Sequence, residues 1–178
     1  MLATQTVAVG VNQRAQIKMT DTEVDAYLRE RNTAAMATIG PSGAPHVVAM
    51  WYGFVGDRVA VETKAKSQKV QNLRRDPRMT LMMESGAGYE ELRGVELVGR
   101  AEISEDPDVL WELGVSVFER YYGPVTKEME PLVHAMLHNR VVVLLNVERV
   151  ASWDHRKLGL AMPSSMDPAS ASQASGAK

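Results

Sequence analysis

The stretch that decides the fold is TAAMATIGPSGAPHVVAMWYGFVGDRVAVET, residues 33–63. Segments 33–40, 46–54 and 58–63 are rich in apolar and β-branched residues, and the turns PSGAP and Gly56-Asp57 separate them. Such segments, bounded by Gly and Pro, are typical of strands joined by short hairpin connections. The pattern predicts three consecutive antiparallel strands that form a meander.

The middle segment, 46–54, is apolar on both of the faces that a strand presents. On one face lie Val48, Met50, Tyr52 and Phe54, and on the other lie Val47, Ala49 and Trp51. A strand with two apolar faces is normally covered on both sides. We therefore expect either a central strand or a strand that lies under a ligand.

The remaining elements follow from capping signals and periodicity. The capping box Thr20-x-x-Glu23 predicts a helix over about 21–31. The further elements that we expect are a short helix at 67–75, strands at 78–84, 93–103 and 140–153, and a helical excursion at 107–139. Antiparallel strands in sequence order with few helices favour a mainly β fold with flanking helices, a closed or split β-barrel.

Length and composition suit one domain. The chain has 178 residues, and we expect an N-terminal mobile arm over 1–18, a single domain over 19–158 and a disordered C-terminal tail over 159–178. It has no cysteine, no basic and apolar leader, and no run of about 20 apolar residues. We expect a soluble cytoplasmic protein with no membrane partner.

The formal net charge of −2 excludes a general attraction to nucleic acid, so an anionic ligand needs a local basic cluster. The best candidate is ETKAKSQKVQNLRRDPR, residues 62–78. Ser67 is placed to cap the helix that follows, and the free N–H groups at a helix start attract anions. Thr63, Lys64, Lys66 and Lys69 surround that start. Two interpretations remain open at this point: a phosphate pocket, or a solvated charged face.

Two other features bear on chemistry. Trp51 and Tyr52 lie on the preceding strand, where a flat heteroaromatic ring could rest while its phosphate reaches the basic cluster. The alternative is that Trp51 packs in the core or in a dimer contact. His134 and His138 are four residues apart, but the HAMLH sequence lacks the glutamate of HExxH, so we expect no metal site.

Three stretches together resemble a known family: TIGPSGAPHVVAMWYGF, VETKAKSQKVQNLRRDPRMTLMME and YEELRGVELVGRAEI. They are similar to the flavin and deazaflavin oxidoreductases of the pyridoxamine 5'-phosphate oxidase-like split-barrel superfamily. The resemblance is greater to the actinobacterial branch that uses the deazaflavin coenzyme F-420. It covers about residues 21–153, most of the chain.

The resemblance implies an FMN-binding-like split barrel that forms a homodimer with two cofactor sites at the subunit interface. Its motifs imply that the cofactor phosphate is held by Thr63, Lys64, Ser67, Gln68 and Lys69, that the ring is lined by Val48, Ala49, Met50 and Trp51, and that Trp153 reaches the partner's site.

The implied activity is hydride transfer from coenzyme F-420 to a small unsaturated substrate. The alternatives are an FMN-binding flavoprotein, or a non-catalytic protein that binds flavin, deazaflavin or haem. The sequence names no catalytic residue, and the proton donor could be solvent, Tyr52 or Tyr89. The vitamin B6 oxidase carries an arginine and a lysine on the strand before the phosphate corner, and strand 46–54 has neither. The arginine–histidine pair of that oxidase is matched only loosely by His155-Arg156.

Overall fold

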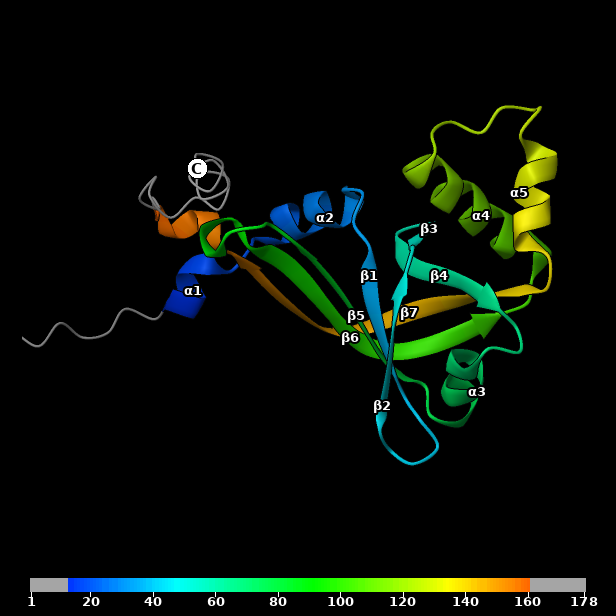
Figure 1. Ribbon diagram of the computed structural model, residues 1–178, viewed down its shortest axis with the longest axis horizontal. Helices are drawn as coiled ribbons and strands as arrows, with labels where there is room; N and C mark the ends of the chain where they lie inside the picture. The colour runs from blue at the N-terminus through cyan, green and yellow to red at the C-terminus, as the bar shows by residue number, and fades with distance from the viewer. Residues whose placement is uncertain (1–12, 161–178) are drawn as a thin grey trace, which may run out of the picture.

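A computed structural model describes residues 13–160 of the chain (Figure 1). Its strands are β1 (Ala34–Ile39), β2 (Pro45–Met50), β3 (Gly53–Val55), β4 (Arg58–Lys64), β5 (Arg78–Ser85), β6 (Arg93–Ser104) and β7 (Arg140–Asp154). Its α-helices are α1 (Gln13–Ile17), α2 (Asp21–Arg29), α3 (Gln68–Arg75), α4 (Pro107–Tyr121) and α5 (Glu130–Leu137), and the short 3-10 helices are η1 (Tyr89–Glu91) and η2 (His155–Leu158).

The strands form one antiparallel sheet in the order β2-β1-β5-β6-β7-β4-β3. The two end strands, β2 and β3, are separated along the chain only by Trp51 and Tyr52. Since two residues cannot span a flat sheet of seven strands, the sheet must curve until its ends meet at this joint. The result is a curved half-barrel with flanking helices, which agrees with the predicted mainly β fold.

The two predicted hairpins are confirmed, because β1 pairs with β2 and β3 pairs with β4, both antiparallel. The prediction that the three segments form one meander of three strands is wrong. Segment 46–54 divides at Trp51-Tyr52, so β2 pairs with β1, whereas β4 pairs with β3 and β7. The prediction of a central strand is also wrong, because β2 ends the strand order and its outward residues are exposed. The segment is apolar throughout because its first half packs beside β1 and its second half packs beside β4, on either side of the joint. Whether β2 lies under a ligand stays a prediction.

The main core fills the inside of the half-barrel. Its largest fully buried side chains include Tyr27, Tyr52, Met36, Leu81, Met83, Val61 and Val95. On β6, Val95 and Leu97 are buried whereas Arg100 and Glu102 are exposed, so this strand presents one face to the core and the other to solvent.

The helical excursion forms a second layer. Helix α4 covers β3, β4 and β7 through Leu113 and Val117, and α5 packs on α4 through Val133 and Leu137. Gly114 permits this close contact, because a Cβ there would lie 2.6 Å from a methyl carbon of Leu137. In Figure 1 the α4–α5 pair stands at one end of the sheet, and α1, α2 and η2 lie toward the other.

The expected arm over 1–18 is described only from residue 13. There α1 contacts η2 and β7, and the backbone N–H of Met19 donates to Ser152 Oγ at 3.1 Å. The rest of the expected arm, and residues 161–178 of the expected tail, lie outside the described residues. Within residues 13–160 the helices are all too short or too polar to cross a bilayer.

Candidate functional site

Two hydroxyls and one ammonium group meet where β4 gives way to α3. Thr63, buried at the end of β4, accepts a hydrogen bond from Lys69 Nζ at 3.0 Å, and its Oγ1 lies 3.4 Å from Ser67 Oγ. The first turn of α3 carries no acidic residue. Ser67 does occupy the N-cap position, but its side chain makes no capping hydrogen bond, so that part of the prediction is wrong. We call Thr63, Ser67 and Lys69 the hydroxyl–lysine cradle.

The electrostatics of the cradle favour an anion. Partial burial, and then the positive charge of Arg140, lower the pKa of Lys69 below the usual value for a lysine. A negative charge in the cradle would offset both the cost of burying the Lys69 ammonium and its repulsion by Arg140. The cradle therefore has the donors, the charge and the helix start that a phosphate group requires.

Lys64 points elsewhere. Because side chains alternate along a strand, Lys64 and Thr63 leave β4 on opposite faces. The Lys64 ammonium donates to the carbonyl of His138 at 2.8 Å, and Arg140 Nε donates to the carbonyl of Met136 at 2.7 Å. Both cations thus sit at the C-terminal end of α5, where positive charge is favourable.

Arg140 is a charged residue of this corner that sequence reasoning missed. It begins β7, and the pairing of β4 with β7 places it directly opposite Lys64. Nothing in the local sequence around position 140 indicates this neighbour, since the contact joins residues 76 positions apart in the chain. Only the strand pairing reveals it.

The corner is linked to β2 by a chain of polar side chains, of which Asn72 and Thr38 are buried. Gln68 Nε2 donates to Asn72 Oδ1 at 2.8 Å, and Asn72 Nδ2 donates to Thr38 Oγ1 at 3.0 Å. Thr38 Oγ1 in turn lies 3.5 Å from His46 Nδ1, near the start of β2. Helix α3, β1 and β2 are therefore held as one unit. Gln68, a predicted phosphate ligand, uses its amide to orient Asn72.

The four residues predicted to line a ring fall into two pairs. Val48 and Met50 turn inward and pack against the main core, whereas Ala49 and Trp51 face outward. The Trp51 ring stacks on Tyr121 of α4, with centroids 4.4 Å apart and planes 9° apart. A flat molecule against β2 would meet Ala49, Trp51 and the backbone edge, because β1 is the strand that β2 pairs with among the described residues.

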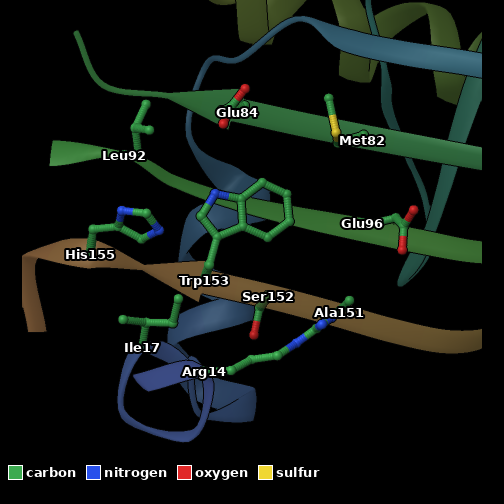
Figure 2. A pocket seen from close by; sticks show the side chains of 10 residues that line it. All are labelled: Arg14, Ile17, Met82, Glu84, Leu92, Glu96, Ala151, Ser152, Trp153 and His155. Carbon is green, nitrogen blue, oxygen red and sulfur yellow. The ribbon is translucent and has the colours of Figure 1, made fainter. Parts of the chain in front are cut away.

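Trp153 lies away from the corner within one chain. It sits thirteen residues beyond Arg140 on β7, about 40 Å along the strand at 3.3 Å per residue. Its indole lies across β6 in a pocket of about 460 Å³, where Figure 2 shows Glu84, Glu96 and Arg14 around it. Gly94 makes room for the ring, because a Cβ there would be 2.3 Å from Trp153 Cζ2. One chain does not bring Trp153 together with the cradle.

The two tyrosines considered as proton donors also lie away from the cradle. Tyr52 is fully buried, donates from its hydroxyl to the carbonyl of Leu28 at 3.0 Å and accepts from Arg120 at 2.6 Å. Burial above all raises the pKa of Tyr52, so this phenol supports the fold. Tyr89 lies on η1, with its ring against His155. His134 stacks on Trp111, and residues 13–160 contain no group of three metal-ligating side chains.

The family follows from this fold and from the sequence. The chain belongs to the pyridoxamine 5'-phosphate oxidase family, whose model matches residues 20–154. The F420H(2)-dependent biliverdin reductase of Mycobacterium tuberculosis (strain CDC 1551 / Oshkosh) is 30% identical over 127 residues, which cover 70% of this chain and 82% of that protein.

Two solved structures extend the comparison. A conserved hypothetical protein of Mycobacterium tuberculosis, Rv2991, is 50% identical and superposes with a TM-score of 0.81, covering 85% of this chain and 94% of its own. A structure described as an F420 reductase has a TM-score of 0.57 at 24% identity, covering 71% and 94%, and shares the fold. The protein is thus a split-barrel family member with distant homology to F420-dependent reductases.

Proposed function

We propose that this protein is a deazaflavin-dependent oxidoreductase that uses coenzyme F-420 to transfer hydride to a small unsaturated organic substrate. The observation that carries the proposal is the hydroxyl–lysine cradle of Thr63, Ser67 and Lys69. Its helix is tied through Asn72 and Thr38 to β1, next to the open edge of β2. The homology to a reductase named for F420H(2) supports this cofactor over other phosphate-bearing rings.

The side chains have distinct roles in this proposal. The cradle holds the cofactor phosphate, and Gln68 keeps α3 in register with β1 through Asn72. Lys64, on the other face of β4, meets the more distant part of an anionic tail. The ring lies along β2 against Ala49, Trp51 and the backbone of Val48 and Met50. The bound cofactor supplies the hydride chemistry, and the protein binds it, orients it and excludes water.

Oxidation of pyridoxamine phosphate fits these residues less well. Strand 46–54 has neither arginine nor lysine. Arg156 is held by Asp154 through contacts of 2.8 and 2.6 Å, and His155 Nδ1 lies 2.8 Å from the carbonyl of Tyr89. Two side chains engaged in this way are poorly placed to grip a substrate.

The test is equilibrium binding of oxidised deazaflavin coenzyme and of FMN, followed by fluorescence, to the wild type, Lys69→Ala and Lys127→Ala. We expect micromolar binding of deazaflavin and a loss of about tenfold, about 1.4 kcal/mol, in Lys69→Ala, because a charge-assisted contact is removed. Lys127 is an exposed lysine between α4 and α5, so its removal should change nothing.

The outcomes separate the alternatives. Binding of FMN alone would favour a flavoprotein that uses the same cradle. Binding of haem, or of deazaflavin without turnover of any acceptor, would favour a non-catalytic binding protein. Deazaflavin binding that Lys69→Ala leaves unchanged would show that the phosphate lies elsewhere.

The pKa of Lys69 predicts how binding depends on pH. Since that pKa is lowered, the ammonium loses its proton at a lower pH than an ordinary lysine does. Affinity should be constant below the pKa of Lys69 and should fall as the pH rises through it. Lys69→Arg keeps its charge at alkaline pH, so the fall should disappear in that variant. An identical alkaline fall in wild type and Lys69→Arg would assign the titration to another group.

We also propose a homodimer in which Trp153 reaches the cofactor site of the partner. The support is the position of Trp153, far along β7 from the cradle of its own chain, in an open pocket (Figure 2). Sedimentation analysis should give the mass of two chains, and Trp153→Ala should weaken deazaflavin binding. A monomer, or a dimer whose Trp153→Ala variant binds deazaflavin normally, would contradict this arrangement.

A further inference from the structure

Three aromatic rings form an exposed shelf where β2 ends. They belong to Trp51, at the joint between β2 and β3, and to Tyr121 and Tyr122, at the end of α4. Besides its stacking on Tyr121, Trp51 meets the Tyr122 ring edge-on, with centroids 5.5 Å apart and planes at 75°. Trp51 is 41% exposed and Tyr122 is 60% exposed. We call these three residues the aromatic shelf.

Hydrogen bonds between the end of α4 and the barrel hold the shelf in place. Arg120 Nη2 donates to the carbonyls of Leu28 and Glu30, and its contact to Leu28 is 2.6 Å long. The Tyr121 hydroxyl donates to the carbonyl of Asn32 at 2.6 Å. These bonds fasten the last turn of α4 to the segment between α2 and β1. The planes of Trp51 and Tyr121 are therefore fixed before any ligand arrives.

Packing of α4 on the barrel explains only part of this arrangement. Tyr121 is bonded to the barrel and stacks on Trp51, so it has a structural role. Tyr122 contacts Phe118 and Trp51 but leaves most of its ring in solvent. A large exposed aromatic next to a fixed stack contributes little to the core. It does offer a π-face to a flat molecule at low entropic cost.

We infer that the aromatic shelf binds the acceptor substrate, and that this substrate is a planar, conjugated ring system. The inference rests on the proposed function, because the shelf adjoins the part of β2 to which that proposal assigns the cofactor ring. Hydride transfer requires the donor and acceptor atoms to approach to about 3–3.5 Å, with the two π-systems aligned. A shelf at the end of the same strand would hold a flat acceptor beside the ring.

The test uses a matched pair of ligands, naphthoate and decahydronaphthoate, which share a bicyclic carboxylate skeleton but differ in planarity. Calorimetry should show that the wild type binds naphthoate more tightly than its saturated analogue. In Tyr122→Ala, naphthoate should bind about three- to tenfold more weakly, as expected for the loss of one aromatic contact. Decahydronaphthoate should bind as it does to the wild type.

Two variants control for packing. Tyr122→Phe keeps the ring and should retain the preference for naphthoate. Leu132→Ala removes an exposed apolar side chain from α5, in the same helical layer, and should have no effect on naphthoate binding.

A kinetic experiment tests the same residue during turnover. With reduced deazaflavin as donor and menadione as acceptor, Tyr122→Ala should raise the KM for menadione by a similar factor, while kcat and deazaflavin affinity stay near the wild-type values.

The outcomes distinguish this inference from the proposed function. The inference that the aromatic shelf binds the acceptor would be refuted by a wild type with no preference for naphthoate, or by a Tyr122→Ala variant that binds naphthoate normally. Neither result bears on the proposed function, which the deazaflavin titration tests. A wild type that fails to bind deazaflavin but shows the Tyr122-dependent preference for naphthoate would refute the reductase. It would leave the shelf as a binding site for planar ligands.

Discussion

Glu62 carries a carboxyl group in a place where a negative charge is costly. It is only 8% exposed, and its Oε2 has no hydrogen-bond partner among the described residues. Arg140 Nη1 lies 3.7 Å from its Oε1, too far for a good hydrogen bond. Burial raises the pKa of Glu62, and the nearby charges of Arg140 and Lys64 offset this only in part. An ion pair with Arg140 would lower the pKa of Glu62, whereas burial raises it. Burial has the larger effect because the contact to Arg140 is long.

This raised pKa predicts how the free energy of unfolding depends on pH. The folded protein binds the Glu62 proton more tightly than the unfolded chain does, so stability from this group is present at low pH. It is lost as the pH rises from the ordinary glutamate pKa through the raised one. Glu62→Gln should remove that slope and should be at least as stable as the wild type at neutral pH, by up to about 1 kcal/mol.

Urea unfolding between about pH 4 and about pH 8 measures the effect of Glu62→Gln. Glu105→Gln is the control, because Glu105 is exposed and pairs with Arg74 on the surface. A loss of several kcal/mol at neutral pH in Glu62→Gln would mean that the charge stabilises the corner after all.

At the scale of elements, α3 is attached to the sheet by a polar contact. Asn72 is fully buried, bonds to Thr38 on β1 and accepts from Gln68 one turn earlier. Thr38 is 1% exposed, so it finds no water in place of a missing partner. The start of α3, and with it the cradle, therefore depends on Asn72 for its position.

Asn72→Ala should lower the free energy of unfolding by about 1–3 kcal/mol, because Thr38 and Gln68 both lose a partner. The variant should also weaken deazaflavin binding, since the cradle loses its support. Gln71→Ala, on the exposed side of the same helix, should change stability by no more than about 0.5 kcal/mol. Urea unfolding and deazaflavin titration of both variants decide the matter. Equal stability of the two would show that the other contacts of α3, such as those of Val70, Leu73 and Arg75, hold it without Asn72.

At the scale of the whole molecule, Arg120 joins the helical layer to the barrel. Its guanidinium donates to two carbonyls and to the Tyr52 hydroxyl, and it lies over the Tyr52 ring at 4.2 Å. The carbonyls belong to Leu28 and Glu30, at the end of α2. One side chain thus connects α4, α2 and the β2–β3 joint.

Arg120→Ala should destabilise the protein by about 2–3 kcal/mol, because charge-assisted bonds to buried acceptors are lost. Amide hydrogen exchange should accelerate more in α4 than in β5 and β6, since α4 loses one of its attachments while the sheet keeps its own bonds. Arg149→Ala, which removes an exposed pair with Glu96, should cost less than about 1 kcal/mol. Unchanged exchange in α4 would show that its other contacts, including the bond from the Tyr121 hydroxyl to Asn32, hold the helical layer without Arg120.

Much of the fold could be predicted because its signals are local. The capping box at Thr20 and Glu23 is present as expected, and α3 spans residues 68–75 against a prediction of 67–75. Helix α2 was predicted to continue to about residue 31 but ends at Arg29. The carbonyls of Leu28 and Glu30 are taken by Arg120, a residue 90 positions from Glu30 in the chain. No local pattern contains that information.

The sequence by itself determined the element types, the mainly β class, the family motifs and the candidate cradle of Thr63, Ser67 and Lys69. These depend on residues within a few positions of one another, whose spacing is set by helix and strand geometry. The tertiary structure decided that segment 46–54 bends into two end strands, that Arg140 joins the corner, and that Tyr122 stands beside Trp51. These depend on which strands pair and where the sheet curves. Pairing and curvature minimise the free energy of the whole chain, so no short stretch of sequence specifies them.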